Sequence, residues 1–532
     1  MNLRDANVAR LATEEFDALI IGGGINGAVS AAALAARGAR VALIDARDFA
    51  GFTSQQSSNL VWGGIKYMEG YEFGLVAGLC KSRNELLDSF PSTVKEIRFL
   101  MTLHRQFRFH PWVILASTWL YWLLGRAKTR TPRLLSVAQI KRSEPLIDSN
   151  TCSAGIVYSD AFLHDNDARF VFNFVRSAMD KGCVAANYVG SSGAIRDEAG
   201  GWNTEVQDQV SGRTFTIRSK ILINAAGAFV DDHNRRCGID TRYHHLLSKG
   251  IHLIVPRISD KHRVLAFFAD DERLFFAIPM ANRTCIGTTD TRVDDPLTKV
   301  SDEDRDFVLS NINARLELPT PLRREDVIAE RCGVRPLATL KASGDSLDVH
   351  QLSRKHVIEM DAARKHISIF GGKLTDCLNV GNEICEHATQ LGLALQPVGK
   401  WYGEPSAAAR AAFFKRAGEL GLDEIVASDT HEVLSERLWR RYAANAGPML
   451  DAIEQDPSLA EPLIDQAGIR RCEIDYLVRN EMIVKLEDYL RRRSKIELLM
   501  PRATLRESKG LREACEKLFG DEAQQRLDEY FN

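Results

Sequence analysis

The clearest pattern of apolar and polar positions in the chain lies between residues 16 and 45. A short apolar run, Ala18–Ile21, is typical of a buried parallel strand, and Val41–Ile44 is a second run of the same kind. The alanine-rich segment between them has helical composition and stops at Gly38. The pattern predicts a strand, a helix and a second strand, the unit from which parallel sheets are built.

Three glycines occupy the junction between the first strand and the helix. Gly22 permits a tight turn, Gly24 lets the backbone approach a pyrophosphate, and Gly27 lets the helix pack closely on the strand. The free N–H groups at the start of the helix would face the phosphates. Asp45 ends the second strand, where a carboxylate can accept hydrogen bonds from an adenosine ribose. Because strand, glycines, helix and acidic residue coincide, we predict a dinucleotide site rather than a chance glycine turn.

A polar loop follows the second strand at residues 49–70. Its small hydrogen-bonding side chains suit a segment that wraps a cofactor, and Gly63 and Gly64 would let the backbone approach a flat ring. An ordinary surface loop is the alternative. Residues 71–142 are helix-like and partly basic.

The later patterns predict a second sheet and a helical end. Residues 201–226 are typical of a hairpin whose second arm leads into Asn-Ala-Ala-Gly, another place where backbone could meet a cofactor. Residues 245–340 alternate strand-like runs with charged connections, which indicates an antiparallel sheet distinct from the parallel one. Residues 366–392 repeat the order of strand, glycine turn and helix. Residues 406–532 are charged, helical in period and almost free of strand patterns, and we interpret them as a separate helical domain.

Composition and charge exclude several classes of protein. The 532 residues are 45% hydrophobic and 26% charged, as in ordinary globular proteins, and the net charge of −2 gives no reason to expect a nucleic acid partner. The ten cysteines include no C-x-x-C pair, so no metal site is predicted and a reduced, cytoplasmic compartment is expected. The first residues contain no apolar core of signal-peptide length.

Two segments allow two interpretations each. Residues 112–124, WVILASTWLYWLL, are too short to span a membrane. We favour a buried helix packed under the substrate domain, with a helix lying in the membrane interface as the alternative. The basic residues 491–495 are interpreted as a solvated surface rather than as a binding site.

Nine segments together resemble the FAD-dependent glycerol-3-phosphate dehydrogenases. They occur in the order of that family, from about residue 17 to about residue 482, and the GVRPL, GGKLT and GTTD motifs are more specific than the glycine motif. The segments are IGGGINGA (21–28), FTSQQSSNLVWGGIKYMEGYEF (52–73), YSDAFLHDNDAR (158–169), NAAGAFVD (224–231), KGIHLIVPR (249–257), IGTTDT (286–291), CGVRPL (332–337), FGGKLTD (370–376) and CEIDYLVRNEM (472–482).

The resemblance implies an α/β fold in three parts. These are a Rossmann-like FAD-binding domain, a substrate domain with an antiparallel sheet, and an all-helical C-terminal domain. The oxidoreductase region would cover residues 1–395 and the helical domain residues 396–532. Within the first region, the FAD-binding segments would be about 17–75, 150–240 and 345–395, and the substrate segments about 76–149 and 241–344.

The resemblance also implies the reaction and the residues of the site. Glycerol 3-phosphate, or a closely related hydroxy-phosphate, would be oxidised to the ketone, with hydride passing to flavin N5 and electrons then to quinone. Arg335 would lie by the reacting hydroxyl and His252 would line the site, and we take both as catalytic. The substrate would contact Lys66, Tyr67, Thr289, Arg354 and Lys373. FAD would contact Gly22, Gly24, Ile25, Asn26, Gly27, Asp45, Thr53, Ser54, Ser57, Ser58, Trp62, Gly63, Gly64, Ala226, Gly227, Gly372, Lys373, Leu374 and Thr375.

The chain departs from the family pattern at several of these positions. Trp62 replaces a histidine beside the flavin, and Lys66 replaces an arginine whose bidentate geometry lysine lacks. After GGKLT the chain has Asp376, Cys377 and Leu378 instead of Thr-Tyr-Arg, so a cation is missing and a carboxylate is added near the anion site. We therefore hypothesise a re-shaped pocket.

Three functions follow from these observations. The first is a quinone-linked dehydrogenase that contacts the inner face of the cytoplasmic membrane through residues 110–130, with a homodimer as one expected assembly. The second is an oxidase or dehydrogenase of the same fold that acts on a different hydroxy acid or hydroxy-phosphate, with oxygen as a possible acceptor. The third is a catalytically silent FAD-binding protein.

Overall fold

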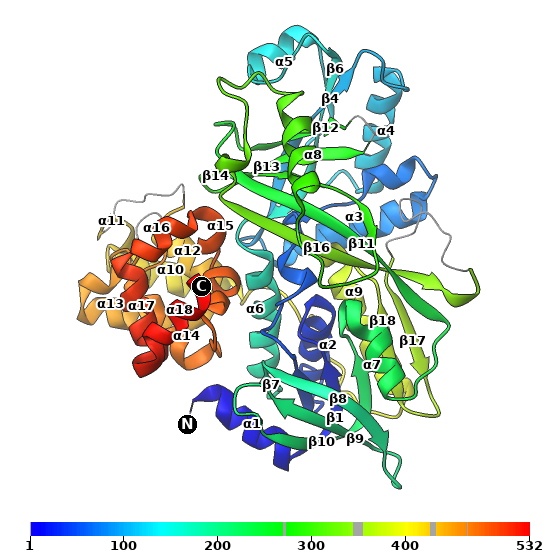
Figure 1. Ribbon diagram of the computed structural model, residues 1–532, viewed down its shortest axis with the longest axis vertical. Coiled ribbons are helices and arrows are strands. Elements are labelled where there is room, and N and C mark those ends of the chain that lie inside the picture. The colour runs from blue at the N-terminus through cyan, green and yellow to red at the C-terminus, as the bar shows by residue number, and fades with distance from the viewer. Residues whose placement is uncertain (1, 270–272, 344–354, 426–431, 465–466) are drawn as a thin grey trace.

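The chain folds around two β-sheets, and its C-terminal helices form a body beside them (Figure 1). The computed structural model describes residues 2–269, 273–343, 355–425, 432–464 and 467–532.

The first sheet holds the predicted strand–helix–strand unit at its centre. Five of its strands run parallel in the order β18-β10-β1-β2-β7, and β17, β9 and β8 add antiparallel pairs. The strands are β1 (Glu15–Ile21), β2 (Val41–Ile44), β7 (Val184–Ala186), β8 (Val189–Arg196), β9 (Trp202–Asp208), β10 (Thr214–Asn224), β17 (Val357–Asp361) and β18 (His366–Phe370). The carboxyl ends of β1, β10 and β18 therefore meet at one edge, where ligands bind in open α/β sheets.

Both faces of this sheet are covered. Ala18 and Ile20 of β1 pack with the alanines of α2 (Ile25–Ala35), α6 (Asp167–Met179) and α9 (Cys377–Gln390). Leu19 and Ile21 point to the other face, where α1 (Leu3–Thr13) and the β8–β9 hairpin cover them. This double cover explains why the strands are continuous apolar runs. The parallel sheet and the helix after each glycine turn confirm the predicted fold class.

The second sheet is larger than the sequence patterns predicted. Its strands are β3 (Leu60–Val61), β4 (Val94–His104), β5 (Arg133–Leu135), β6 (Cys152–Leu163), β11 (Tyr243–Pro256), β12 (Arg263–Phe268), β13 (Leu274–Met280), β14 (Arg283–Gly287), β15 (Thr291–Val293) and β16 (Ala329–Leu340). Most pairs are antiparallel as expected, and β4–β12 is parallel. β3 and β6 belong to this sheet although they fall within segments that we predicted for FAD binding.

The helix-like interpretation of residues 71–142 was wrong in part. This segment contains α3 (Phe73–Ser89), α4 (Pro111–Leu124) and α5 (Val137–Ser143), but β4 lies between the first two helices. Charged residues at positions 95, 96 and 98 conceal the strand pattern, and the pairing of β4 with β6 on one side and β12 on the other makes the segment a strand. α7 (Val230–Arg236) and α8 (Asp302–Asn313) complete the helices of this region.

Helix α4 is a surface helix, so the favoured interpretation as a buried helix was wrong. Only Thr118 and Tyr121 are buried, whereas Trp112 is 61% and Leu123 60% exposed. Within the described ranges, we find no helix with the length and apolar character that crossing a bilayer requires.

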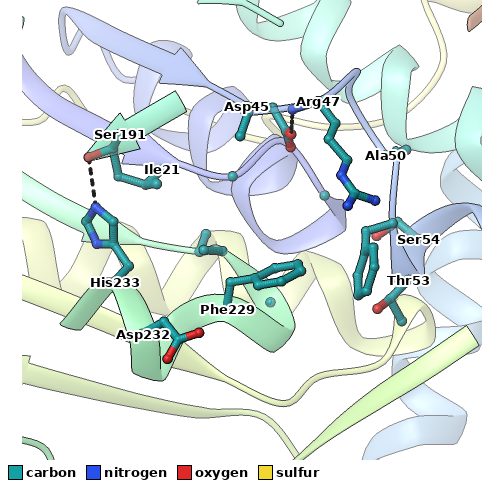
Figure 2. Close-up of a pocket in the computed structure, with 18 of the residues that line it drawn as sticks. Ile21, Asp45, Arg47, Ala50, Thr53, Ser54, Ser191, Phe229, Asp232 and His233 are labelled. Atoms are coloured by element: carbon teal, nitrogen blue, oxygen red, sulfur yellow. Dashed lines mark hydrogen bonds between the residues drawn. The ribbon is translucent and has the colours of Figure 1, made fainter. Parts of the chain in front are cut away.

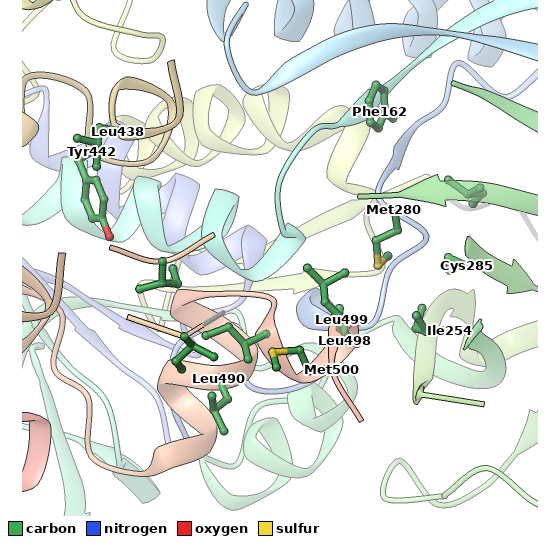
Figure 3. Packing of buried hydrophobic residues seen from close by; sticks show 14 of the residues in the cluster. Phe162, Ile254, Met280, Cys285, Leu438, Tyr442, Leu490, Leu498, Leu499 and Met500 are labelled. Carbon is green, nitrogen blue, oxygen red and sulfur yellow. The ribbon is translucent and has the colours of Figure 1, made fainter. Parts of the chain in front are cut away.

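The C-terminal region is helical, as predicted. Its helices are α10 (Ala407–Glu419), α11 (Leu422–Ile425), α12 (Leu434–Tyr442), α13 (Gly447–Gln455), α14 (Arg471–Asn480), α15 (Ile496–Leu499), α16 (Arg502–Glu507), α17 (Lys509–Phe519) and α18 (Ala523–Phe531). Leu498, Leu499 and Met500 share one buried apolar cluster with Met280 and Cys285 of the second sheet (Figure 3). The helical domain is therefore joined to the rest of the molecule by a common core.

The interpretation of residues 491–495 as solvated surface was wrong. Arg491, Arg492 and Arg493 are all buried. They lie on a π-helical turn, Asp488–Arg493, which packs against α6.

Candidate active site

Two cavities lie at the carboxyl edge of the first sheet and meet at the amino end of α2. The first has a volume of about 360 Å³ and the second about 290 Å³. Gly24 lines the first and Ile25 the second, while Thr53 and Ser54 line both. A ligand that occupies both cavities must therefore pass the start of this helix, whose N–H groups favour negative charge.

The first cavity is built around the predicted glycine turn (Figure 2). The carboxylate of Asp45 accepts a 2.7 Å hydrogen bond from the Gly23 amide and a 2.8 Å bond from the Arg47 amide. These bonds hold the carboxylate at the end of β2, facing the cavity. Burial raises the pKa of Asp45 to about 6. The predicted cofactor residues that line this cavity are Gly22, Gly24, Asp45, Thr53, Ser54, Ala226 and Gly227.

The glycines allow the backbone segments around this cavity to touch. A Cβ atom at Gly22 would lie 2.6 Å from the carbonyl oxygen of Ala225, and one at Gly27 would lie 1.8 Å from that of Gly22. Gly22 also has a φ of +100°, which side chains disfavour. The turn after β1 therefore packs directly against the Asn-Ala-Ala-Gly end of β10.

Several residues of the first cavity were missed by the sequence analysis. Phe52 and Phe229 form an aromatic pair with centroids 5.0 Å apart, and the guanidinium carbon of Arg47 lies 5.5 Å from the centroid of Phe52. His233 forms a 3.0 Å hydrogen bond with Ser191, and burial lowers its pKa to about 4. The available signal was that Arg47, Phe52, Phe229 and His233 lie in the segments that follow β2 and β10.

The second cavity contains both predicted catalytic residues. Arg335 on β16 lies over Gly250 on β11, where a Cβ atom would be only 1.9 Å from its Nη2. Nη2 donates to Thr288 Oγ1 at 3.1 Å, and Nη1 lies 3.3 Å from a carboxylate oxygen of Asp290. Glycine at position 250 thus lets a guanidinium anchored by its neighbours reach the cavity.

His252 lies two residues along β11, on the same face as Gly250. Its side chain is buried, and neither ring nitrogen has a hydrogen-bond partner among the residues that the structure describes. Burial, with Arg331 and Arg335 nearby, lowers the pKa of His252 to about 3. The imidazole is therefore neutral at physiological pH, with a lone pair that can accept a hydrogen bond.

Cationic and aromatic side chains line the same cavity. Lys373 Nζ donates a 2.7 Å hydrogen bond to the Tyr67 hydroxyl and lies 3.9 Å from the centroid of that ring. Lys355, which the sequence analysis missed, also lines the cavity, and Trp62 and Phe276 form an edge-to-face pair in its wall. The predicted residues that line this cavity are Ile25, Thr53, Ser54, Ser57, Ser58, Trp62, Tyr67, His252, Arg335, Gly372, Lys373, Leu374 and Thr375.

Other predicted residues lie outside the lining of the described cavities. Lys66 is not part of either wall, and the Thr289 hydroxyl accepts a 3.1 Å hydrogen bond from the Ile251 amide. Asn26 donates to the carbonyl of Gly371 at 3.0 Å and so ties α2 to the Gly-Gly-Lys turn. Gly27, Gly63 and Gly64 line neither described cavity. Arg354 lies outside the described residues.

The carboxylate of Asp376 does not face the second cavity. It accepts hydrogen bonds from Ser82 at 2.7 Å and Asn379 at 2.6 Å, and lies 3.0 Å from the ring of His356, which also contacts Glu383 at 3.1 Å. Burial opposes a charge on His356, but the two carboxylates outweigh it and raise its pKa to about 9. The negative charge of Asp376, which the sequence placed near the anion site, is thus compensated by His356.

These observations fit FAD. The carboxylate of Asp45 and the aromatic pair suit the adenosine half, and the amino end of α2 suits the pyrophosphate. The second cavity, with its unpaired imidazole and its glycine turn at 371–372, suits a flavin ring and a small substrate. The cavities therefore define the class of the protein as a flavin-dependent oxidoreductase.

Comparisons with known proteins agree with this class. The family model described as FAD dependent oxidoreductase matches residues 17–358, and that of the C-terminal domain of alpha-glycerophosphate oxidase matches residues 400–526. Glycerol-3-phosphate dehydrogenase of Pseudomonas aeruginosa is 31% identical over 92% of this chain and 93% of its own. Glycerol-3-phosphate dehydrogenase 2 of Mycobacterium tuberculosis is 30% identical over 92% and 83%.

A solved structure has the same fold over nearly its whole length. The FAD complex of glycerol-3-phosphate dehydrogenase from Bacillus halodurans covers 99% of this chain and 97% of its own, with a TM-score of 0.75 and 24% identity. The chain belongs to the family of FAD-dependent glycerol-3-phosphate dehydrogenases.

Proposed function

We propose that the protein oxidises the secondary hydroxyl of glycerol 3-phosphate to the ketone, giving dihydroxyacetone phosphate, with FAD as cofactor and quinone as final electron acceptor. The observation that carries the proposal is the position of Arg335 and neutral His252 on one face of the second cavity, whose wall also holds Lys373. A phosphate requires cationic donors, and alcohol oxidation requires a proton acceptor.

Each residue has a defined task in this reaction. Lys373, with Tyr67, holds the phosphate. Arg335 holds the hydroxyl oxygen and stabilises the negative charge that develops there. A ring nitrogen of His252 accepts the hydroxyl proton. When bound, the flavin supplies the acceptor for the hydride that leaves the carbon.

An anaerobic titration tests the proposal. Glycerol 3-phosphate should bleach the yellow holoenzyme, whereas glycerol and lactate at the same concentration should not. Absence of bleaching with glycerol 3-phosphate would contradict the proposed substrate and favour another hydroxy-phosphate or a hydroxy acid. Reduction of a quinone without release of peroxide in air supports the proposed acceptor, and stoichiometric peroxide contradicts it.

We also propose that α4 rests on the inner face of the cytoplasmic membrane. Its exposed apolar side chains, Trp112 and Leu123, and the flanking basic residues support an interfacial helix. The homodimer and the cytoplasmic location remain predictions. We keep the domain boundary near residue 396 as a proposal, which the gap between the two family matches, at residues 359–399, supports.

A further inference from the structure

Three consecutive arginines of the C-terminal domain contact the loop that separates the two cavities. We call residues 48–56 the cofactor loop. On either side of Arg491, Arg492 and Arg493, the side chains of Leu490 and Leu498 belong to one buried apolar cluster (Figure 3). Asn166, which directly precedes α6, also donates to the carbonyl oxygens of Arg491 and Ser494, at 2.5 and 2.7 Å.

The first end of the cofactor loop is fixed by ion pairs. Arg493 donates two hydrogen bonds to the carboxylate of Asp48, at 2.7 and 2.8 Å, and Arg492 Nε donates a third at 2.7 Å. Asp48 has no exposed surface. Burial opposes its ionisation, but the two guanidinium groups hold the pKa of Asp48 below its usual range. Such bidentate pairs fix direction as well as distance.

The second end of the loop is fixed by Arg491. Its Nη2 donates to the carbonyl oxygen of Gln55 at 2.6 Å and to the side-chain oxygen of Gln56 at 2.9 Å. Arg491 is buried and forms no ion pair with any described residue. A buried guanidinium loses most of its hydration. Its hydrogen bonds to Gln55 and Gln56 of the loop offset part of this loss.

The middle of the loop lies where the two cavities adjoin. The Ala50 amide donates to the carbonyl of Gly23 at 3.0 Å, and the Ser54 hydroxyl accepts a 3.0 Å bond from the Ile25 amide at the start of α2. Thr53 and Ser54 line both cavities. The anchors at Asp48 and Gln55 therefore fix the position of Thr53 and Ser54 in the walls of both cavities.

We propose that the C-terminal domain sets the affinity for FAD by holding the cofactor loop, and that Arg491 is a positioning residue in this coupling. No residue of the C-terminal domain lines either described cavity, so its effect on FAD is indirect, and the cofactor loop both contacts the three arginines and lines the cavities. By linkage, bound FAD must in turn stabilise the turn at 488–493 against local opening. The inference depends on FAD as cofactor and not on the identity of the substrate.

Arg491→Met tests the proposal, with Arg437→Met as a matched control. Arg437 is also a buried arginine of the C-terminal domain, but it pairs with Glu473 and not with the loop. After removal of FAD, the dissociation constant is measured by quenching of flavin fluorescence. Loss of two hydrogen bonds from a charged donor predicts binding roughly ten- to a hundredfold weaker for Arg491→Met. Arg491→Lys should recover part of this loss, and Arg437→Met should bind FAD as the wild type does.

Hydrogen exchange supplies a readout that does not depend on activity. In the FAD-free protein, Arg491→Met should speed exchange at residues 48–56, and Arg437→Met should not. In the wild type, FAD should slow exchange at residues 488–493 more than in α16, which does not contact the loop. An unchanged dissociation constant in Arg491→Met, equal weakening in both variants, or no effect of FAD on residues 488–493 would each overturn the proposal.

Discussion

The backbone amide of Gly63 donates a 3.1 Å hydrogen bond to the carboxylate of Asp160, a side chain with no exposed surface. Arg83 pairs with the same carboxylate at 3.1 Å, and the Tyr121 hydroxyl donates to it at 2.6 Å. Tyr121 is one of the two buried residues of α4. One carboxylate thus connects the exposed helix to the turn that carries Trp62 into the wall of the second cavity.

We predict that Asp160→Asn lowers the free energy of unfolding by about 3 kcal/mol or more, because it leaves Arg83 buried without its counter-charge. Denaturant unfolding of the holoenzyme measures this. The double variant Asp160→Asn/Arg83→Met should recover much of the loss. Additive losses in the double variant would show that the two side chains do not depend on each other.

The affinity for FAD should depend on pH through Asp45. Its pKa of about 6 in the cofactor-free protein means that the carboxylate is ionised above pH 6 and protonated below it. Protonation removes an acceptor for the ribose hydroxyls, so the dissociation constant should rise by up to about tenfold per pH unit below 6. Asp45→Asn should bind more weakly at pH 7.5 and lose this dependence, and a parallel pH slope in the variant would contradict the assignment.

Loss of His252 should slow the reaction without preventing substrate binding. His252→Asn removes the proton acceptor, so kcat should fall about 10²- to 10⁴-fold while the dissociation constant for the substrate changes little. Because the pKa of His252 is near 3, the residue stays neutral over the usual working range. If the reaction rate falls as the pH drops below about 6, the cause should be protonation of the substrate phosphate. The same fall should then be seen in His252→Asn. A fall that disappears with His252 would refute this.

The fold should lose stability at alkaline pH through His356. Its pKa of about 9 lies above the ordinary value of 6.5, so its contribution is fully present below pH 6.5 and is lost as the pH rises through 9. The loss should be on the order of 3 kcal/mol at most, since 1 pKa unit corresponds to about 1.4 kcal/mol. His356→Gln should be less stable at pH 6 and nearly independent of pH from 6.5 to 9. Thermal unfolding across this range is the measurement.

Membrane binding should depend on the exposed face of α4. Trp112→Ser/Leu123→Ser removes two large apolar side chains, each worth about 1.5–3 kcal/mol when buried in lipid, so binding to anionic vesicles should weaken at least about tenfold. Ile195, which is equally exposed on β8, provides the control Ile195→Ser. Trp122 is a poor choice for this test because its Nε1 donates inward to Thr129 at 2.6 Å. Equal binding of all variants would exclude α4 as the contact.

The parts of the site that could be predicted from the sequence are those whose structure depends on residues close to them in the chain. The glycine turn and Asp45 depend on neighbours within one strand–helix–strand unit, and the Gly-Gly-Lys turn at 371–373 has the same origin. Arg335 and His252 were placed by motif, and the sheet register then brings them to one face. That register depends on pairing between segments far apart in the chain, which no local sequence pattern specifies.

The features that were missed depend on distant partners. β4 carries charges that are typical of a surface helix, yet pairing with β6 and β12 makes it a strand. The arginines at 491–493 have the composition of a solvated surface until Asp48, more than 400 positions away, supplies a buried counter-charge. α4 has the composition of a core helix, and only the packed structure shows which side remains exposed.

The contact between Asp48 and Arg493 has a consequence for biosynthesis. Every described residue that lines the two cavities lies between positions 21 and 375, so a nascent chain that has emerged through α9 already contains them all. Asp48 still lacks both guanidinium partners at that stage, because they emerge more than a hundred residues later. The cofactor loop can therefore be anchored only after residues 488–493 have been made, and a chain that stops short of Arg493 leaves the ribosome with this loop unanchored.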